Sequence, residues 1–113
     1  MRYSRTGFMP KTVTTETAVK NEIKRWLAIF GWRCWHNLQG LGSYKGMPDI
    51  TAIKKGVIIW IEAKAPKGIQ SPHQIAFQDM IESNGGHYIL AESSKDVEDF
   101  ILHFIENGKT RLL

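Results

Sequence analysis

Asp49 and Glu62 are two acidic residues that a short β-hairpin would bring face to face. Each lies in a stretch with the composition of a strand, and the intervening Lys55-Gly56 has the composition of a tight turn. If these two residues form the turn, the register places Asp49 directly opposite Glu62, with Cβ atoms about 4.5–5.5 Å apart. An odd-numbered turn would not give this pairing.

Two carboxylates at this distance repel each other, which raises a pKa or requires a cation between them. Mg²⁺ or Mn²⁺ suits the arrangement, because a hard divalent ion binds one or two carboxylates together with water and phosphate oxygens. Lys64 points to the same side of its strand as Glu62, and the carbonyl of Ala63 can reach the same ion. Two acids and a lysine on one surface predict a centre that hydrolyses phosphodiester bonds.

A surface ion pair between Glu62 and Lys64, near an unrelated Asp49, is the alternative interpretation, since exposed ion pairs are common. Two features favour the catalytic interpretation. The charges follow a strongly apolar segment, residues 57–61, which is typical of a central strand. Asp49 comes directly after Gly46-Met47-Pro48, a restricted turn that positions its backbone sharply.

The elements that must position these residues follow the order α-β-β-β-α-β-α. The third strand, the next helix and the fourth strand form a right-handed crossover, which makes those strands parallel, whereas the first three strands form an antiparallel meander. The fold class is therefore α/β, with a mixed central sheet flanked by helices. Helix caps and apolar spacing predict a helix from Thr14 or Thr15 to Gly31, strands at 32–38, 48–54 and 57–64, a helix from Ser71 to Asn84, a strand at 87–91 and a helix from Ser94 to Asn107.

Each predicted helix carries an apolar stripe that should face the core. Trp32 and Trp35 in the first strand are expected to pack in the core rather than to stack on bases. The stripe residues are Val19, Ile23, Trp26, Leu27 and Phe30 in the first helix, Ile75, Phe77, Met80 and Ile81 in the second, and Val97, Phe100, Ile101, Phe104 and Ile105 in the third.

The composition fits one domain of ordinary size, with 113 residues and a formal net charge of +4. A basic balance favours nucleic acid as a partner, although a mildly basic protein without an anionic ligand is equally compatible. The single Cys34 excludes an internal disulfide, and no stretch resembles a signal peptide or spans a membrane, so a cytoplasmic location is expected. Residues 1–13 are expected to form a basic N-terminal arm, and residues 14–113 the domain.

Several short motifs together resemble the VRR-NUC branch of the PD-(D/E)xK nuclease superfamily. The resemblance extends from Thr15 to Phe100, which is most of the chain. An Asp followed by Glu-x-Lys is a weak signal alone, whereas the full series is fairly specific. The motifs are Gly46-Met47-Pro48-Asp49, Ile61-Glu62-Ala63-Lys64, Ser71-Pro72-His73-Gln74, Phe77, and Gly85-Gly86 before a strand.

The resemblance implies a restriction-endonuclease-like domain that cleaves DNA with Mg²⁺ or Mn²⁺. Asp49, Glu62 and the carbonyl of Ala63 would be metal ligands, Lys64 the catalytic lysine, and Gln74 a further residue of the site. Small free-standing members are similar to Holliday-junction resolvases, tend to be homodimers and occur in phages and bacteria. We therefore expect selectivity for branched DNA. We also expect the protein to be located in the cytoplasm of a bacterial or phage-infected cell. A non-catalytic DNA- or RNA-binding module with the same fold is the alternative.

The first helix of the superfamily often supplies one more glutamate, and Glu16 and Glu22 compete for this role. Glu16 is favoured because it is in line with the apolar stripe, whereas Glu22 lies on the flank. Gln74 has a second possible role, because a glutamine at this position can bond back to the backbone of Ser71 as a helix cap. The residues expected to contact DNA are Lys45, Lys67, Ser71 and His73.

Overall fold

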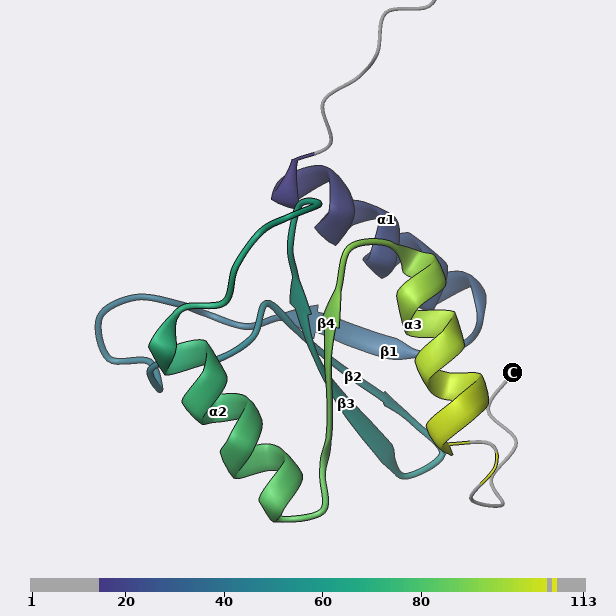
Figure 1. The fold of residues 1–113 in the computed structure, drawn as a ribbon. Helices are drawn as coiled ribbons and strands as arrows, with labels where there is room; N and C mark the ends of the chain where they lie inside the picture. Colours follow the sequence, from purple (N-terminus) through teal and green to yellow (C-terminus); the bar gives the residue numbers. More distant parts are fainter. Residues whose placement is uncertain (1–14, 106, 108–113) are drawn as a thin grey trace, which may run out of the picture.

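The computed structural model describes residues 15–105 and residue 107, so the expected arm at residues 1–13 and Thr14 lie outside the described residues. The order of elements is the predicted one (Figure 1). One sheet has the strand order β1-β2-β3-β4, with antiparallel pairing except between β3 and β4, which are parallel. The elements are α1 (Glu16–Ile29), β1 (Arg33–His36), β2 (Ile50–Lys54), β3 (Val57–Ala63), α2 (Pro72–Ser83), β4 (His87–Ala91), α3 (Ser94–Phe100) and a π-helical turn, η1 (Ile101–Ile105).

The hairpin of β2 and β3 has the predicted two-residue turn at Lys55-Gly56. Both turn residues have positive φ angles, 51° and 82°, as a type I′ turn requires. This turn matches the twist of the strands and fixes the register, in which Ile50 pairs with Ile61. One position further along, the same register puts Asp49 opposite Glu62.

Helices cover both faces of the sheet, with α2 on one side and α1 and α3 on the other (Figure 1). The face that carries Ile50 and Ile61 packs against α1 and α3 and forms the main core. The opposite face carries Trp60 and Tyr88, whose rings lie 5.5 and 6.5 Å from the ring of Phe77 in α2. No helix within the described part of the chain is long and apolar enough to cross a membrane.

The last helix begins one residue earlier than predicted. Its N-cap is Ser93, whose hydroxyl accepts a hydrogen bond from the N–H of Asp96, and not Ser94. The hydroxyl of Ser94 is engaged elsewhere, because it donates to Glu22 Oε2 at 2.6 Å. The π-helical turn then changes the angular spacing of the side chains. As a result, Ile101 and Ile105 are buried, whereas Phe104, expected in the core, is 67% exposed.

Three other stripe or strand residues are less buried than predicted. Trp32 lies in the core as expected, but Trp35 is 51% exposed, because α2 packs against β4 and leaves the β1 end of its sheet face uncovered. Phe30, at the C-cap of α1, is 41% exposed and stacks on the half-buried Trp26. Ile75 is 46% exposed, so Phe77 is the one residue of α2 that is fully buried.

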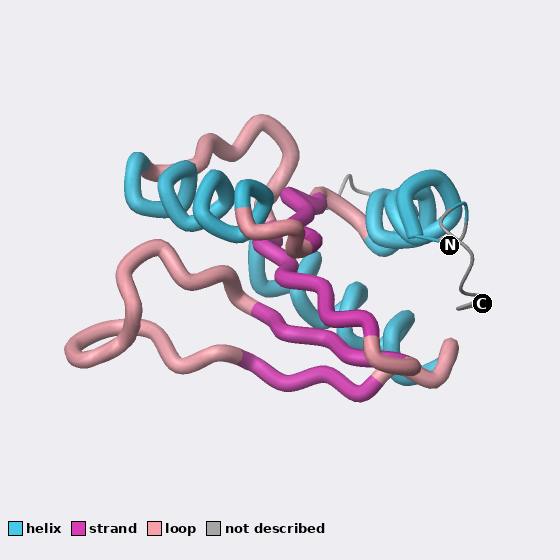
Figure 2. Tube along the Cα trace, turned by 90° about the horizontal axis from the view of Figure 1, so that it is seen from below, coloured by secondary structure: helices cyan, strands magenta, loops and turns pink. Residues whose placement is uncertain are grey.

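The connection between β1 and β2, residues 37–49, projects beyond the sheet as a long loop (Figure 2). Its far end reaches the first turn of α2, where the backbone at Gly46 lies against the carbonyl group of His73. The segment just before Asp49 is therefore in contact with α2, the helix that carries Gln74.

Candidate active site

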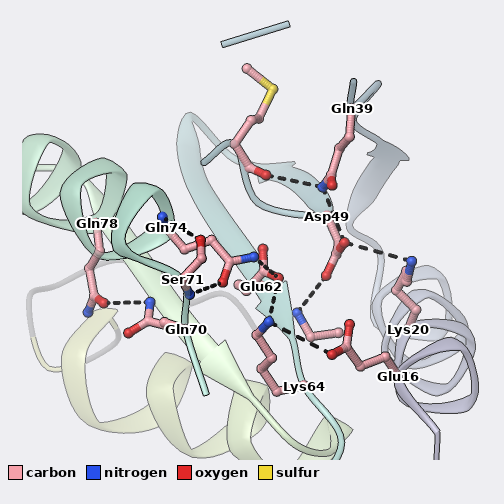
Figure 3. A network of polar contacts seen from close by, with 12 residues as sticks. Glu16, Lys20, Gln39, Asp49, Glu62, Lys64, Gln70, Ser71, Gln74 and Gln78 are labelled. Atoms are coloured by element: carbon pink, nitrogen blue, oxygen red, sulfur yellow. Dashed lines mark hydrogen bonds and ion pairs between the residues drawn. The ribbon is translucent and has the colours of Figure 1, made fainter. Parts of the chain in front are cut away.

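Seven polar side chains from five parts of the chain converge where β2 begins and β3 ends (Figure 3). They come from α1, from the loop before β2, from the end of β3 and the residue after it, and from the first turn of α2. Hydrogen bonds and ion pairs link them into one network. Its members are Glu16, Lys20, Gln39, Asp49, Glu62, Lys64 and the connecting Gln74.

Asp49 is 5% exposed and is fixed by contacts to both of its carboxylate oxygens. Oδ2 accepts a hydrogen bond from the N–H of Ala63 at 2.9 Å, and Oδ1 accepts one from Gln39 Nε2 at 3.3 Å. Lys20 Nζ lies 3.7 Å from Oδ1. The backbone around this residue is also held, because its carbonyl accepts from the N–H of Asn37 at 2.8 Å. Asp49 is therefore a buried, oriented carboxylate rather than an unrelated surface acid.

Glu62 is 2% exposed, and its two carboxylate oxygens have different surroundings. Oε2 accepts from Gln74 Nε2 at 2.9 Å and lies 3.8 Å from Lys64 Nζ. Oε1 is buried and has no hydrogen-bond partner among the described residues. Burial, together with the negative charge of Asp49, raises the pKa of Glu62 to about 8, and the charge of Lys64 opposes both effects.

Lys64 is buried to 8% exposure between two acids from different elements. Its Nζ lies 3.8 Å from Glu16 Oε2 and 3.8 Å from Glu62 Oε2. Both distances exceed those of ordinary N–H···O hydrogen bonds. The two acids thus hold the ammonium group electrostatically and leave its N–H groups for a nearby anion.

Between the two candidate glutamates of α1, the structure brings Glu16 to the network and places Glu22 elsewhere. Glu22 Oε2 accepts hydrogen bonds from both the N–H and the hydroxyl of Ser94, and these lower its pKa. It ties α1 to the start of α3. Glu16 faces Lys64, with about half of its side chain exposed.

Gln74 makes both of the contacts that the sequence left open. Its side-chain oxygen accepts from the N–H of Ser71 at 2.8 Å, and its own N–H donates to the Ser71 hydroxyl, which completes a capping box. Its amide nitrogen donates to Glu62. The cap therefore holds Gln74 in the orientation in which it contacts the carboxylate.

A cavity of about 380 Å³ adjoins the network, between the loop before β2 and the amino end of α2. Three of the four residues expected to contact DNA, Lys45, Ser71 and His73, line it. Lys67 is exposed in the turn before α2, with φ 69°, and is not part of the lining. Gln39 and Gln74 line the cavity and also donate hydrogen bonds to the carboxylates of the network.

Gly46 is the point at which the loop docks on α2. A Cβ at this position would lie 2.0 Å from the carbonyl oxygen of His73, and the φ angle is +79°. We expect Gly46→Ala to push the loop off the helix, because neither backbone can yield without breaking the fit. Cleavage of DNA should fall at least about tenfold, since a shift of about 1 Å at a site can have a large cost.

The matched control for this change is Gly40→Ala in the same loop. Gly40 has φ +118°, and an added Cβ would meet nothing within 4 Å. It therefore introduces the backbone strain without the collision. Equal cleavage rates for the two variants, measured on folded protein, would contradict a role for the docking contact.

Three members of the site were not predicted from the sequence. Lys20 had a signal, because it lies four residues after Glu16 and therefore on the same face of α1. Gln39 and Asn37 had none, because their roles depend on the path of the loop. Asn37 donates from Nδ2 to the carbonyl of Pro48 and accepts from the hydroxyl of Thr51, which braces the approach to Asp49.

The oxygen atoms of this site fit a hard divalent ion. The protein would bind the ion on one side and leave its other side open to solvent and substrate. The buried Glu62 Oε1 has no hydrogen-bond partner within residues 15–105, and each oxygen of Asp49 keeps a second lone pair. The N–H of Ala63 points to Asp49, so its carbonyl points to the same side, as in any strand residue. No three His, Cys, Asp or Glu side chains within the described residues gather as a closed metal cage. Water and phosphate oxygens would complete the shell, which is typical of Mg²⁺.

Comparison with known proteins gives no match to a family model and none to a curated protein. Among solved structures, a chain described as a VRR_NUC domain superposes with a TM-score of 0.68 and 24% identity, over 80% of this chain and 99% of that one. A second, described as a VRR_NUC domain protein, gives 0.65 and 20% identity over 90% and 100% of the two chains. This chain has the fold of those VRR_NUC domains, which confirms the fold that the motifs implied.

Proposed function

We propose that this protein is a VRR-NUC nuclease that hydrolyses phosphodiester bonds in DNA with Mg²⁺ or Mn²⁺. The observation that carries the proposal is the buried pair of Asp49 and Glu62 beside Lys64, with one oxygen of Glu62 that has no hydrogen-bond partner in the described part of the chain. A buried acid pair of this kind is costly without a compensating cation. The likeness to VRR_NUC domains supports the same conclusion.

Asp49, Glu62 and the carbonyl of Ala63 are the residues that would hold the ion. When bound, such an ion supplies a Lewis acid, which lowers the pKa of a water molecule and neutralises the phosphate. Gln74 keeps the Glu62 carboxylate in place through its hydrogen bond to Oε2, so that Oε1 is turned away from the helix cap. Gln39 does the same for Asp49 from the opposite side.

Lys64 stabilises the negative charge that develops on the phosphate oxygens as water attacks. Its ammonium group is already desolvated and positioned by Glu16 and Glu62, so little reorganisation is needed at the moment of reaction. Glu16 acts here as a positioning residue. It limits the motion of the lysine from the side that Glu62 does not cover.

DNA would be gripped through its phosphates next to this centre. Lys45 and His73 line the adjacent cavity, and Lys67 lies in the turn just before α2. Contacts of this type release counterions, so binding should weaken steeply as salt is raised. Selectivity for branched DNA and a homodimeric state, both implied by the motifs, remain predictions.

A cleavage panel tests the proposal. Linear duplex, single-stranded, nicked and four-way-junction DNA are incubated with the full chain in Mg²⁺, in Mn²⁺ and in EDTA, and products are resolved on denaturing gels. We expect cleavage of at least one substrate with either metal and none in EDTA. Binding without cleavage under every metal condition would refute the nuclease and favour a non-catalytic nucleic-acid-binding module.

A further inference from the structure

We infer that the cavity beside the carboxylates receives one unstacked nucleotide next to the scissile phosphate, so that the enzyme prefers DNA with an unpaired nucleotide at the cleavage position. This inference rests on the proposed function and names the class of substrate for it. The loop that carries residues 39–47 and the first turn of α2 form the walls of the cavity.

The cavity has the size and position that such a role requires. Its volume of about 380 Å³ is comparable with that of small-molecule sites, which begin near 300 Å³. Gln39 lines it and donates to Asp49, and Gln74 lines it and donates to Glu62. One side chain therefore separates the cavity from each carboxylate. A group held in the cavity would therefore lie beside a phosphate bound at the carboxylates.

Tyr44 gives the cavity an aromatic surface. It lines the cavity and is 60% exposed, although its ring contacts Phe77 at a centroid distance of 5.5 Å. The two rings are nearly perpendicular, at 81°, so at least one face of the tyrosine ring has no contact with Phe77. Exposed aromatic faces bind bases by stacking, with little dependence on which base is present.

The rest of the lining suits the polar parts of a nucleotide. Lys45 and His73 supply donors for a phosphate, and the amino end of the 12-residue helix α2 opens onto the same space. Ser43 and Gln39 add side-chain groups that can bond to a base edge. The loop is fixed by Gly46 against α2, so the cavity is preformed rather than assembled by the ligand.

A base inside continuous duplex cannot reach this surface without leaving the stack. Extrusion costs least when the base is unpaired or mismatched, and this difference becomes a preference of the enzyme. The cavity would then select DNA by whether one nucleotide is paired or unpaired, independently of the DNA sequence.

The test measures binding with 2-aminopurine, whose fluorescence reports its stacking environment. Two oligonucleotide duplexes carry it at the same position, either unpaired or paired, and each is titrated with the full chain in EDTA. We expect at least about tenfold tighter binding and a larger fluorescence change with the unpaired probe. Tyr44→Leu should lose most of this advantage, because it keeps an apolar contact to Phe77 but has no aromatic face.

Two variants serve as controls. Tyr44→Phe keeps the aromatic face and should therefore retain the preference for the unpaired probe. Leu41→Ala lies in the same loop, is fully exposed, and lies outside the cavity lining. Equal affinity for the two probes, or an unchanged preference in folded Tyr44→Leu, would overturn the inference.

Cleavage of the same duplexes with Mg²⁺ separates this inference from the proposed function. If the protein cuts both duplexes equally and Tyr44→Leu changes nothing, the nuclease stands and the nucleotide cavity falls. If the Tyr44-dependent preference appears in EDTA but no metal supports cleavage, the cavity stands and the nuclease falls.

Discussion

Replacing Lys64 by alanine is expected to reduce metal-dependent DNA cleavage by roughly 10²- to 10³-fold or more, which is the typical cost of removing one preorganised group that stabilises transition-state charge. The lysine is buried and lies 3.8 Å from both Glu16 and Glu62, so its charge is already positioned, and a water molecule in its place would carry no positive charge. Single-turnover rates on the best substrate of the cleavage panel give the measurement.

The matched control is Lys95→Ala. Lys95 is an exposed lysine on α3 that pairs with Asp99 at 2.7 Å and, among the described residues, takes no part in the hydrogen bonds or ion pairs of the candidate site. The Lys95→Ala variant should cleave DNA at the same rate as the original protein. Circular dichroism and thermal melting establish that Lys64→Ala is folded, and stabilisation by Mg²⁺ shows whether its metal site is intact. A folded, metal-binding Lys64→Ala with full activity would remove the lysine from the mechanism.

The second large effect concerns stability with and without a divalent ion. Adding Mg²⁺ or Mn²⁺ should raise the melting temperature, and EDTA should reverse the change. At 100 times the dissociation constant, the gain is about 2.7 kcal/mol. For a domain of this size, that corresponds to roughly 10 °C or more. Differential scanning fluorimetry across metal concentrations measures both the shift and the affinity.

The shift should depend on pH through Glu62. Its folded-state pKa of about 8 lies above the ordinary value of 4.5, so the folded protein holds this proton more tightly than the unfolded chain does. The stabilisation that results is complete below pH 4.5 and is lost as the pH rises to about 8. The ion binds the ionised carboxylate and competes with the proton. Metal should therefore stabilise the protein more at pH 8 than at pH 6.

Glu62→Gln isolates this group. The amide keeps the shape of the side chain but neither ionises nor attracts a cation, so stabilisation by metal should largely disappear. Without metal, the variant should be more stable than the original protein at pH 9. Glu92→Gln, at an exposed position after β4, should leave both properties unchanged. A metal shift of equal size in Glu62→Gln would show that the ion binds elsewhere.

The topology and the acid pair were predictable because both depend on short-range patterns. Period-two and helical spacing define the elements, Ser71-Pro72 and Gln74 specify a capping box, and the crossover rule makes β3 and β4 parallel. The turn at Lys55-Gly56 then fixes the register, and alternation along a strand decides which side chains share a face. No long-range information is needed to bring Asp49 beside Glu62.

Other features depended on how separate elements pack. Spacing along α1 favoured Glu16 over Glu22, but the distance from Glu16 to Lys64 depends on where α1 lies on the sheet. The exposure of Trp35 depends on which strands α2 covers. Phe104 was predicted to be buried, but the π-helical turn rotates it out of the core and leaves it exposed.

The sequence alone thus determined the strand order, the hairpin register and the proximity of Asp49, Glu62 and Lys64, because each follows from interactions between near neighbours in the chain or from regular alternation. Only the tertiary structure decided how Gln39 and Lys20 hold Asp49, and how the loop at Gly46 meets His73 to form a cavity. Those contacts join segments that no periodicity relates, and their distances depend on the packing of whole elements.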